Sequence, residues 1–376
     1  MKIVIALDSF KGVLTAESAC QAVADGILKI APETKIIIKP MADGGEGTAS
    51  AILSARSDGK WIPVKVSGPL PERRVKAGLV WLKKDKTAVV EMASANGLPL
   101  LDKSEQNPLK TSTYGTGELI KAAIKYGAKH IFLAIGGSAT VDGGVGAATA
   151  LGWQFLDIRN KPVKHGGGHL LDIAHIIPPT SINMPPVTIL CDVTNPLCGD
   201  NGAARVFGPQ KGATPSMVKQ LNAGLSHLAK LIKKQFNQNI SSLPCGGAAG
   251  GLGAGGRVFF NAKLTSGINT IMEISKLSHA LIGSNWCITG EGCFDNQSLH
   301  GKVVSGVSLL AKKFGVPVVV FAGLVKVKPA LYKAYGIREA IATHDPAMPM
   351  SRVIRNEQRH LCQTAMQWFS KHLRWE

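Results

Sequence analysis

Short apolar runs alternate with polar segments along the chain, and several of these runs are typical of strands buried on both faces of a parallel sheet. The first run covers residues 2–7. A helix is predicted to begin at 15–18, because apolar residues recur at helical spacing after it. A second strand is predicted at 35–39. This β-loop-α-β order is the opening unit of a doubly wound sheet.

Later parts of the chain repeat the pattern. Further apolar runs lie at residues 130–135, 187–190, 286–289 and 316–321. Each is followed by small or acidic residues, and open α/β sheets bind their ligands beyond the carboxyl ends of such strands. The strands expected near Val64, Leu79 and Ala88 alternate more, which indicates an antiparallel or mixed sheet.

With 376 residues, the chain is too long for one typical hydrophobic core. We therefore expect an α/β fold of two α/β domains. A Rossmann-like parallel-sheet domain would be built from both termini, residues 1–69 and 281–376. A mixed α/β domain would be inserted between them, at residues 70–280.

Composition narrows the class of protein. A hydrophobic content of 45% with 18% charged residues indicates a well-buried globular chain. The net charge of +18 suggests anionic partners, but the basic residues are scattered and no nucleic-acid-binding motif is present. We interpret the scattered positive charge as a field that attracts phosphorylated and carboxylate metabolites. Nucleic acid is the less favoured partner.

Cysteine usage and hydropathy indicate the compartment. The seven cysteines include no C-x-x-C pair, as expected of reduced thiols. No uncharged apolar stretch is long enough for a membrane span. We expect a cytoplasmic protein without a membrane partner.

Two glycine-rich loops carry the first candidate chemistry. In residues 41–48, adjacent glycines can present N–H groups to an anion, while Asp43 and Glu46 can hold Mg²⁺ through water or bind hydroxyls. The alternative is a tight turn with a capping carboxylate. Residues 135–144 offer a chain of donors for phosphate oxygens, followed by Asp142. Each glycine costs about 0.5–1 kcal/mol in a regular element, so this loop favours phosphate binding.

Isolated polar residues follow other strands. Asp192 could be a general base, a metal ligand or an Asx-turn cap, and Asn195 could orient a substrate. Lys11 and Lys211 lie in predicted turns and could contact a carboxylate or phosphate, although a lone loop lysine is often only solvated. Residues 290–295 place two carboxylates after a buried strand.

The standard nucleotide motifs are missing. Residues 251–256 fit G-x-G-x-x-G in letters, but no strand precedes them, so they are weak support for a dinucleotide site. No Walker A or protein-kinase signature occurs.

Taken together and in this order, the loops resemble those of the type I glycerate kinases. The matching segments are residues 2–6 with 8–12, 41–48, 114–120, 135–140, Asp192 with 195–197, 206–215, 248–253, and 288–292 with Asp295. The resemblance covers nearly the whole chain and ends only after about Gly323. The chain departs from the family pattern at Leu7, at Cys293 with Phe294, and in its basic tail, residues 352–374.

The resemblance implies ATP and Mg²⁺ as co-substrates, D-glycerate as the acceptor, and 2-phosphoglycerate rather than 3-phosphoglycerate as the product. It also implies two α/β domains with the active site in the cleft between them. A kinase for another hydroxy-acid, a non-catalytic sugar-acid-binding protein and a dehydrogenase remain alternatives. A homodimer stays open.

Residue roles follow from the needs of phosphoryl transfer, which are positioning and neutralisation of charge. The predicted catalytic residues are Asp192, Lys11 and Asp43. The predicted substrate-binding residues are Asp8, Ser9, Glu46, Asn195, Lys211 and Asp295. The predicted phosphate- and nucleotide-binding residues are Gly136, Gly137, Ser138, Thr140, Gly290, Glu291 and Gly292. The predicted Mg²⁺ ligands are Asp43 and Asp295.

Overall fold

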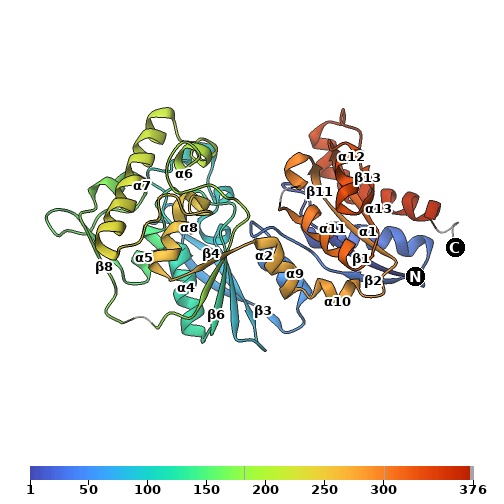
Figure 1. Ribbon diagram of the computed structural model, residues 1–376, viewed down its shortest axis with the longest axis horizontal. Helices are drawn as coiled ribbons and strands as arrows, with labels where there is room; N and C mark the ends of the chain where they lie inside the picture. The colour runs from blue at the N-terminus through green and yellow to red at the C-terminus, as the bar shows by residue number, and fades with distance from the viewer. Residues whose placement is uncertain (182, 300, 373–376) are drawn as a thin grey trace. The chain divides into compact units, whose positions relative to one another are not determined.

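A computed structural model describes residues 1–181, 183–299 and 301–372. The chain divides into two compact units (Figure 1). Unit 1 consists of Met1–Asp43, Ser50–Ser57 and Ile268–Glu376, and unit 2 consists of Gly44–Ala49 and Asp58–Gly267.

Unit 1 contains a five-stranded parallel sheet of order β13-β12-β11-β1-β2. Its strands are β1 (Lys2–Leu7), β2 (Lys35–Ile38), β11 (Trp286–Phe294), β12 (Val318–Val325) and β13 (Ile337–Ala342). Strands from both ends of the chain thus share one sheet. The Rossmann-like fold class is confirmed.

Two long helices cover one face of this sheet. Helix α1 (Ala16–Ile30) begins where the hydroxyl of Thr15 accepts a hydrogen bond from the N–H of Ser18, at 3.2 Å. Helix α13 (Met350–His372) packs against α1. Their apolar residues share a core with alternate residues of β1, such as Ile3 and Ile5, as expected for one buried face of a strand.

Shorter helices complete unit 1. They are α9 (Gly267–Ile274), which starts at the unit boundary, α10 (Leu277–Leu281), α11 (Val303–Lys313) and α12 (Pro329–Tyr332). Helix α11 packs on β11 and β12.

Unit 2 contains a mixed six-stranded sheet of order β10-β9-β6-β5-β4-β3. Its strands are β3 (Gly59–Ser67), β4 (Arg74–Leu82), β5 (Thr87–Glu91), β6 (His130–Ala134), β9 (Val187–Leu190) and β10 (Lys263–Thr265). Strands β5, β6, β9 and β10 are parallel to one another, whereas β4 pairs antiparallel with both β3 and β5. The expectation of a mixed sheet is confirmed.

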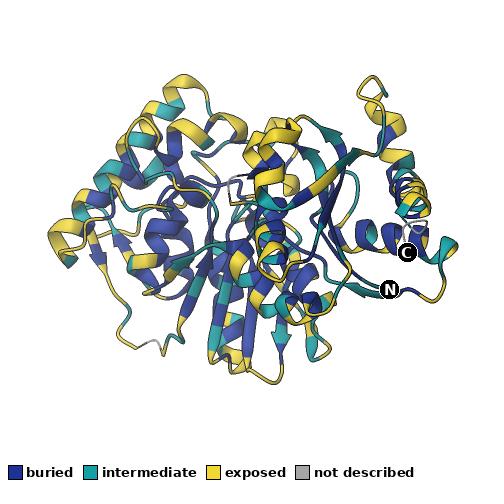
Figure 2. Ribbon diagram, turned by 45° about the vertical axis from the view of Figure 1, so that its right-hand side comes forward, coloured by how far each residue is buried: buried dark blue, intermediate teal, exposed yellow. Residues whose placement is uncertain are grey.

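The helices of unit 2 bury its central strands, which are dark blue in Figure 2. They are α3 (Ala93–Asn96), α4 (Tyr114–Tyr126), α5 (Val145–Ala150), α6 (Ala203–Phe207), α7 (Pro215–Phe236) and α8 (Ala248–Phe259), with α2 (Thr48–Ala55) crossing the unit boundary. A separate hairpin joins β7 (Gln154–Leu156) to β8 (His175–Ile177).

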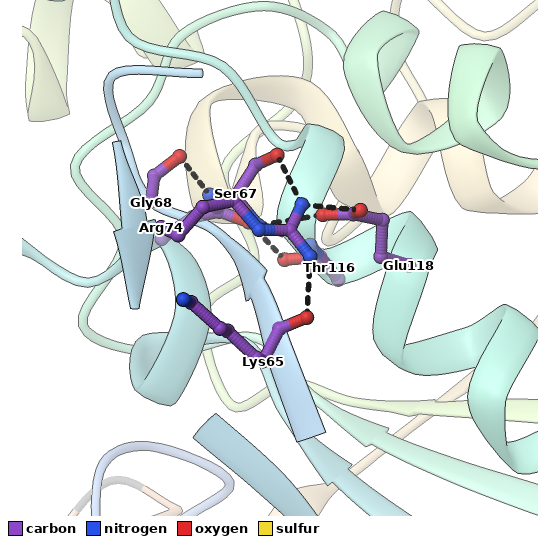
Figure 3. A network of polar contacts seen from close by, with 7 residues as sticks. Lys65, Ser67, Gly68, Arg74, Thr116 and Glu118 are labelled. Atoms are coloured by element: carbon purple, nitrogen blue, oxygen red, sulfur yellow. Dashed lines mark hydrogen bonds and ion pairs between the residues drawn. The ribbon is translucent and has the colours of Figure 1, made fainter. Parts of the chain in front are cut away.

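A polar network attaches helix α4 to the sheet (Figure 3). Arg74 on β4 donates to the carboxylate of Glu118 at 2.7 Å, and the same carboxylate accepts the N–H of Ser67 at 2.6 Å. Near the start of the helix, Thr116 donates its N–H and its hydroxyl to Asn96, each at 2.7 Å. These bonds fix the beginning of α4 over the end of β3.

The structure differs from the sequence expectations at three points. Strand β3 belongs to unit 2 because it pairs with β4 along its whole length, so unit 2 resumes at Asp58 and not at residue 70. Unit 2 ends at Gly267 and not at residue 280. The strand predicted at 286–289 continues to Phe294, because β11 stays paired with β12.

No helix within the described part of the chain combines the length and the apolarity needed to cross a bilayer.

Candidate active site

Carboxylates gather where the parallel strands of unit 1 end, which we call its carboxyl edge. Asp8 directly follows β1 and is only 6% exposed, and its Oδ1 accepts the N–H of Ser9 at 2.6 Å. Burial, with the nearby charge of Asp43, raises the pKa of Asp8 to about 7. Asp8 is therefore poised to gain or lose a proton near neutral pH.

Lys11 and Asp43 form a loose ion pair beside Asp8. Their Nζ and Oδ2 atoms lie 4.0 Å apart, and the lysine side chain is 77% exposed. The exposed ammonium group of Lys11 can contact a ligand while it stays close to the carboxylate of Asp43. The predicted residues Asp8, Ser9, Lys11 and Asp43 therefore lie together in this structure.

Glu291 adds a third carboxylate at this edge. Its Oε1 is buried and has no hydrogen-bond partner among the residues that the structure describes. Burial raises its pKa, while Ser298 and Lys302 oppose this shift. A buried carboxylate oxygen without a partner is costly, which marks this position as one for a ligand or ion.

The segment Gly290–Gly292 lies inside β11 and is not the loop expected from the sequence. A Cβ atom on Gly290 would lie 1.9 Å from the carbonyl oxygen of Phe321 on β12. Glycine at 290 therefore permits close strand pairing. The nucleotide-binding role of this segment stays a prediction. Because the segment is a strand, a phosphate-binding loop does not support that role.

Asp295 serves the turn that follows β11. Its Oδ1 accepts the N–H of Gln297 at 2.8 Å, and its own N–H donates to the hydroxyl of Ser298 at 3.1 Å. This is Asx-turn geometry. Its role as a Mg²⁺ ligand stays a prediction.

In unit 2, the glycine-rich loops at residues 44–47 and 136–140 contact each other. The N–H of Gly136 donates to the carbonyl of Gly44 at 3.1 Å. A Cβ atom on Gly136 would lie 2.4 Å from the Cα of Gly45. Part of the glycine content of both loops is thus explained by their contact, and phosphate binding by Gly136 and Gly137 stays a prediction.

Lys211 lies beneath the 136–140 loop. It is 2% exposed, and its ammonium group donates to the hydroxyl of Ser138 at 2.7 Å and to the carbonyl of Thr140 at 2.8 Å. Burial lowers its pKa to about 7, opposed by the charge of Asp142. Lys211 ends a 3₁₀ turn, Pro209–Lys211, as expected, but its side chain is not solvated and supports the loop from inside. Its substrate-binding role stays a prediction.

Asp142 is also an internal residue. Its carboxylate accepts the N–H and the hydroxyl of Thr113, at 2.8 and 2.9 Å, and the N–H groups of Gly144 and Gly146, at 3.1 and 3.2 Å. The carboxylate thereby fixes the starts of α4 and α5, so its function is structural.

Asp192 follows β9 and is half-buried. Its Oδ1 accepts the hydroxyl of Ser266 at 2.8 Å and the N–H of Gly267 at 3.0 Å. These bonds hold the carboxylate in one orientation. Asn195, nearby in the chain, donates its amide to the carbonyl of Asn201 at 2.9 Å.

Glu91 was missed by the sequence analysis. It ends β5 and is buried, and its two carboxylate oxygens accept the N–H groups of Gly47 and Ala49, at 3.1 and 3.0 Å. Burial raises its pKa. The carboxylate thus satisfies the N–H of Gly47, which belongs to the loop expected to bind an anion, while Glu46 is exposed. A carboxylate directly after an apolar run was the available signal, as at Asp192.

The sequence model of the glycerate kinase family matches residues 3–372. The chain belongs to the glycerate kinase family. This confirms the resemblance of the ordered loops.

Individual relatives agree with the family match. An uncharacterised protein of Synechocystis sp. is 46% identical, covering 96% of this chain and 95% of that protein. Glycerate 2-kinase of Escherichia coli is 40% identical, covering 97% of this chain and 96% of that enzyme. A crystal structure from Salmonella typhimurium LT2, assigned as glycerate kinase 2, superposes with a TM-score of 0.86 at 37% identity, covering 99% of this chain and 98% of that one.

The predicted site residues of this glycerate kinase divide between the units. Unit 1 carries Asp8, Ser9, Lys11, Asp43, Gly290, Glu291, Gly292 and Asp295. Unit 2 carries Glu46, Gly136, Gly137, Ser138, Thr140, Asp192, Asn195 and Lys211. Within the described ranges, no group of three or more His, Cys, Asp or Glu side chains is placed to hold a metal ion.

Proposed function

We propose that this glycerate kinase transfers the γ-phosphoryl group of ATP to the 2-hydroxyl of D-glycerate in the cytoplasm. The observation that carries the proposal is similarity to the glycerate kinase family along residues 3–372. The named 2-kinase relative, which shares 40% of its residues over 97% of this chain, supports the choice of hydroxyl.

Asp192 is the proposed base, or the group that orients the attacking hydroxyl. Its Oδ1 is fixed by Ser266 and Gly267, at 2.8 and 3.0 Å, so the carboxylate is preorganised. A positioned carboxylate that accepts the hydroxyl proton lowers the barrier without covalent chemistry.

In unit 1, Lys11 is proposed to neutralise charge on the transferred phosphoryl group or on the glycerate carboxylate. Its exposed ammonium group, 4.0 Å from Asp43, can reach a ligand while its position stays coupled to that carboxylate. Asp8, with a pKa of about 7, can share a proton with a ligand hydroxyl.

The donor set at this edge suits Mg²⁺, which prefers oxygen ligands and uses few protein carboxylates together with substrate phosphates. The unpartnered buried Oε1 of Glu291, beside Asp8, supports this fit. Asp43 and Asp295, the predicted ligands, would hold the ion, which would offset the negative charge of the phosphates when bound.

Phosphorus NMR of the product tests the proposal. Incubation with ATP, Mg²⁺ and D-glycerate is expected to give 2-phosphoglycerate and ADP. A 3-phosphoglycerate signal would contradict the regiochemistry, and turnover only with another hydroxy-acid would change the acceptor. Tight glycerate binding without ADP release would indicate a non-catalytic binding protein.

The variant Asp192→Asn tests the catalytic assignment. Removing the carboxylate charge while keeping the shape is expected to lower kcat by about 10²- to 10⁴-fold with little change in folding. Asp200→Asn is the matched control, because the Asp200 side chain is 93% exposed. Equal kcat values for the two variants would refute the role of Asp192.

A further inference from the structure

A surface groove runs between α1 and α13 of unit 1, two helices that lie side by side (Figure 1). The helices approach closely at Gly26, where an added Cβ would lie 2.4 Å from the carbonyl oxygen of Cys362. The groove has a volume of about 780 Å³. Small-molecule sites occupy about 300–1,000 Å³, so the groove has room for a metabolite.

The charges that line the groove are unbalanced. Lys29 of α1 and Arg355 and Arg359 of α13 contribute three cations, and Asp25 contributes one carboxylate. The amide of Gln21 donates to that carboxylate at 2.8 Å. Two net positive charges would remain even if Asp25 also paired with a cation.

The cations of the groove lack strong partners. The Nζ of Lys29 lies 3.7 Å from the sulfur of Cys362, a weak acceptor. Within residues 1–181, 183–299 and 301–372, neither guanidinium forms an ion pair. Arg355 and Arg359 are four residues apart on one helix and therefore neighbours on its surface.

We propose that this groove is a binding site for a small organic phosphate carrying several negative charges. Paired guanidinium groups bind phosphate oxygens in bidentate fashion, and Lys29 would supply a third point charge. The side-chain amides of Gln358 and Gln363, which also line the groove, can bind the hydroxyls of such a molecule. Such a site would explain the positive charge of the basic tail, which the kinase reaction does not explain.

The experiment is a titration of the full-length protein, carrying ¹³C-methyl methionine, with inorganic tripolyphosphate. Met366 lines the groove and reports binding there independently of phosphoryl transfer; its signal is assigned with Met366→Leu. We expect a saturable shift of this methyl signal. Replacing both arginines by alanine should weaken binding by more than about tenfold, because both guanidinium groups would donate charge-assisted hydrogen bonds to the phosphate oxygens.

Two controls keep the outcome decisive. Arg338→Ala removes an exposed cation of unit 1 outside the groove and should leave the Met366 titration unchanged. Citrate, a polyanion without phosphate, should bind more weakly than tripolyphosphate.

Several results would overturn the proposal. They are no shift of Met366 at millimolar tripolyphosphate, equal weakening by Arg338→Ala, citrate binding as tight as that of tripolyphosphate, or tighter binding of an acidic peptide. Loss of glycerate phosphorylation would not bear on it, because the methyl signal does not depend on turnover.

Discussion

At the scale of single residues, burial changes the chemistry of two predicted ligand-binding side chains in opposite directions. It raises the pKa of Asp8 and lowers the pKa of Lys211, each to about 7. In both cases the charged form is disfavoured because water is excluded. Asp8 can use this property in proton exchange, whereas Lys211 supports the 136–140 loop.

Lys211 should make folding stability depend on pH. Because its folded pKa of about 7 lies below its ordinary value of 10.5, the unfolded chain binds the proton more tightly between these values. Stability therefore rises with pH across this window. From about pH 7 to about pH 9, the free energy of unfolding of the wild type should gain on the order of 2 kcal/mol relative to Lys211→Met.

Urea denaturation at the two pH values measures this gain. The control Lys230→Met replaces an exposed lysine of α7 and should keep the wild-type slope. Parallel pH profiles for wild type and Lys211→Met would show that the pKa of Lys211 is not lowered in the folded protein.

At the scale of elements, β11 shows how two similar glycines can differ in function. Gly290 faces the backbone of β12, with 1.9 Å between an added Cβ and the carbonyl oxygen of Phe321. Gly292 has no atom nearer than 3.5 Å to an added Cβ, the nearest being the Cα of Phe10. Gly290 is therefore required by strand pairing, and Gly292 has room for a side chain or a ligand.

The pair Gly290→Ala and Gly292→Ala tests this difference. Gly290→Ala must push β11 away from β12 and should lower the free energy of unfolding by about 1–3 kcal/mol. Gly292→Ala should change it by less than about 0.5 kcal/mol, while a rise in KM for ATP would support its predicted nucleotide contact. Equal losses of stability in urea denaturation would contradict the assigned contacts.

At the scale of the whole molecule, each unit has a hydrophobic core of its own among the residues that the structure describes. One is formed by residues of unit 2 such as Leu79, Leu133 and Leu225. The other is formed by residues of unit 1 such as Ile5, Val319 and Trp368. A unit with its own core can fold alone when its chain is continuous.

The fragment of residues 44–267 should therefore fold by itself, since it contains all of unit 2. We expect cooperative thermal unfolding and a native-like aromatic circular dichroism signal. The fragment of residues 1–57 should remain unfolded, because β1 loses β11 and its core partners on β12 and α13. Non-cooperative melting of the 44–267 fragment would show that the core of unit 2 is insufficient without unit 1.

The local elements and the family could be predicted from the amino-acid sequence. Continuous apolar runs specify β1 and β9 at the predicted positions, and Thr15 caps α1, because these features depend on neighbouring residues. The order of loops gave the glycerate kinase resemblance. The candidate cluster of Asp8, Lys11 and Asp43 follows from the shared carboxyl edge of parallel strands.

Which polar residues are internal became visible in the folded protein alone. Lys211 bonds to partners 73 and 71 residues away, and Asp142 bonds to Thr113, 29 residues away. Burial and pairing over such distances depend on how elements pack, and residue type and spacing carry no signal for them. The same reason explains why Gly290 was expected in a ligand loop although it lies in a strand, and why the basic groove of α1 and α13 was unforeseen.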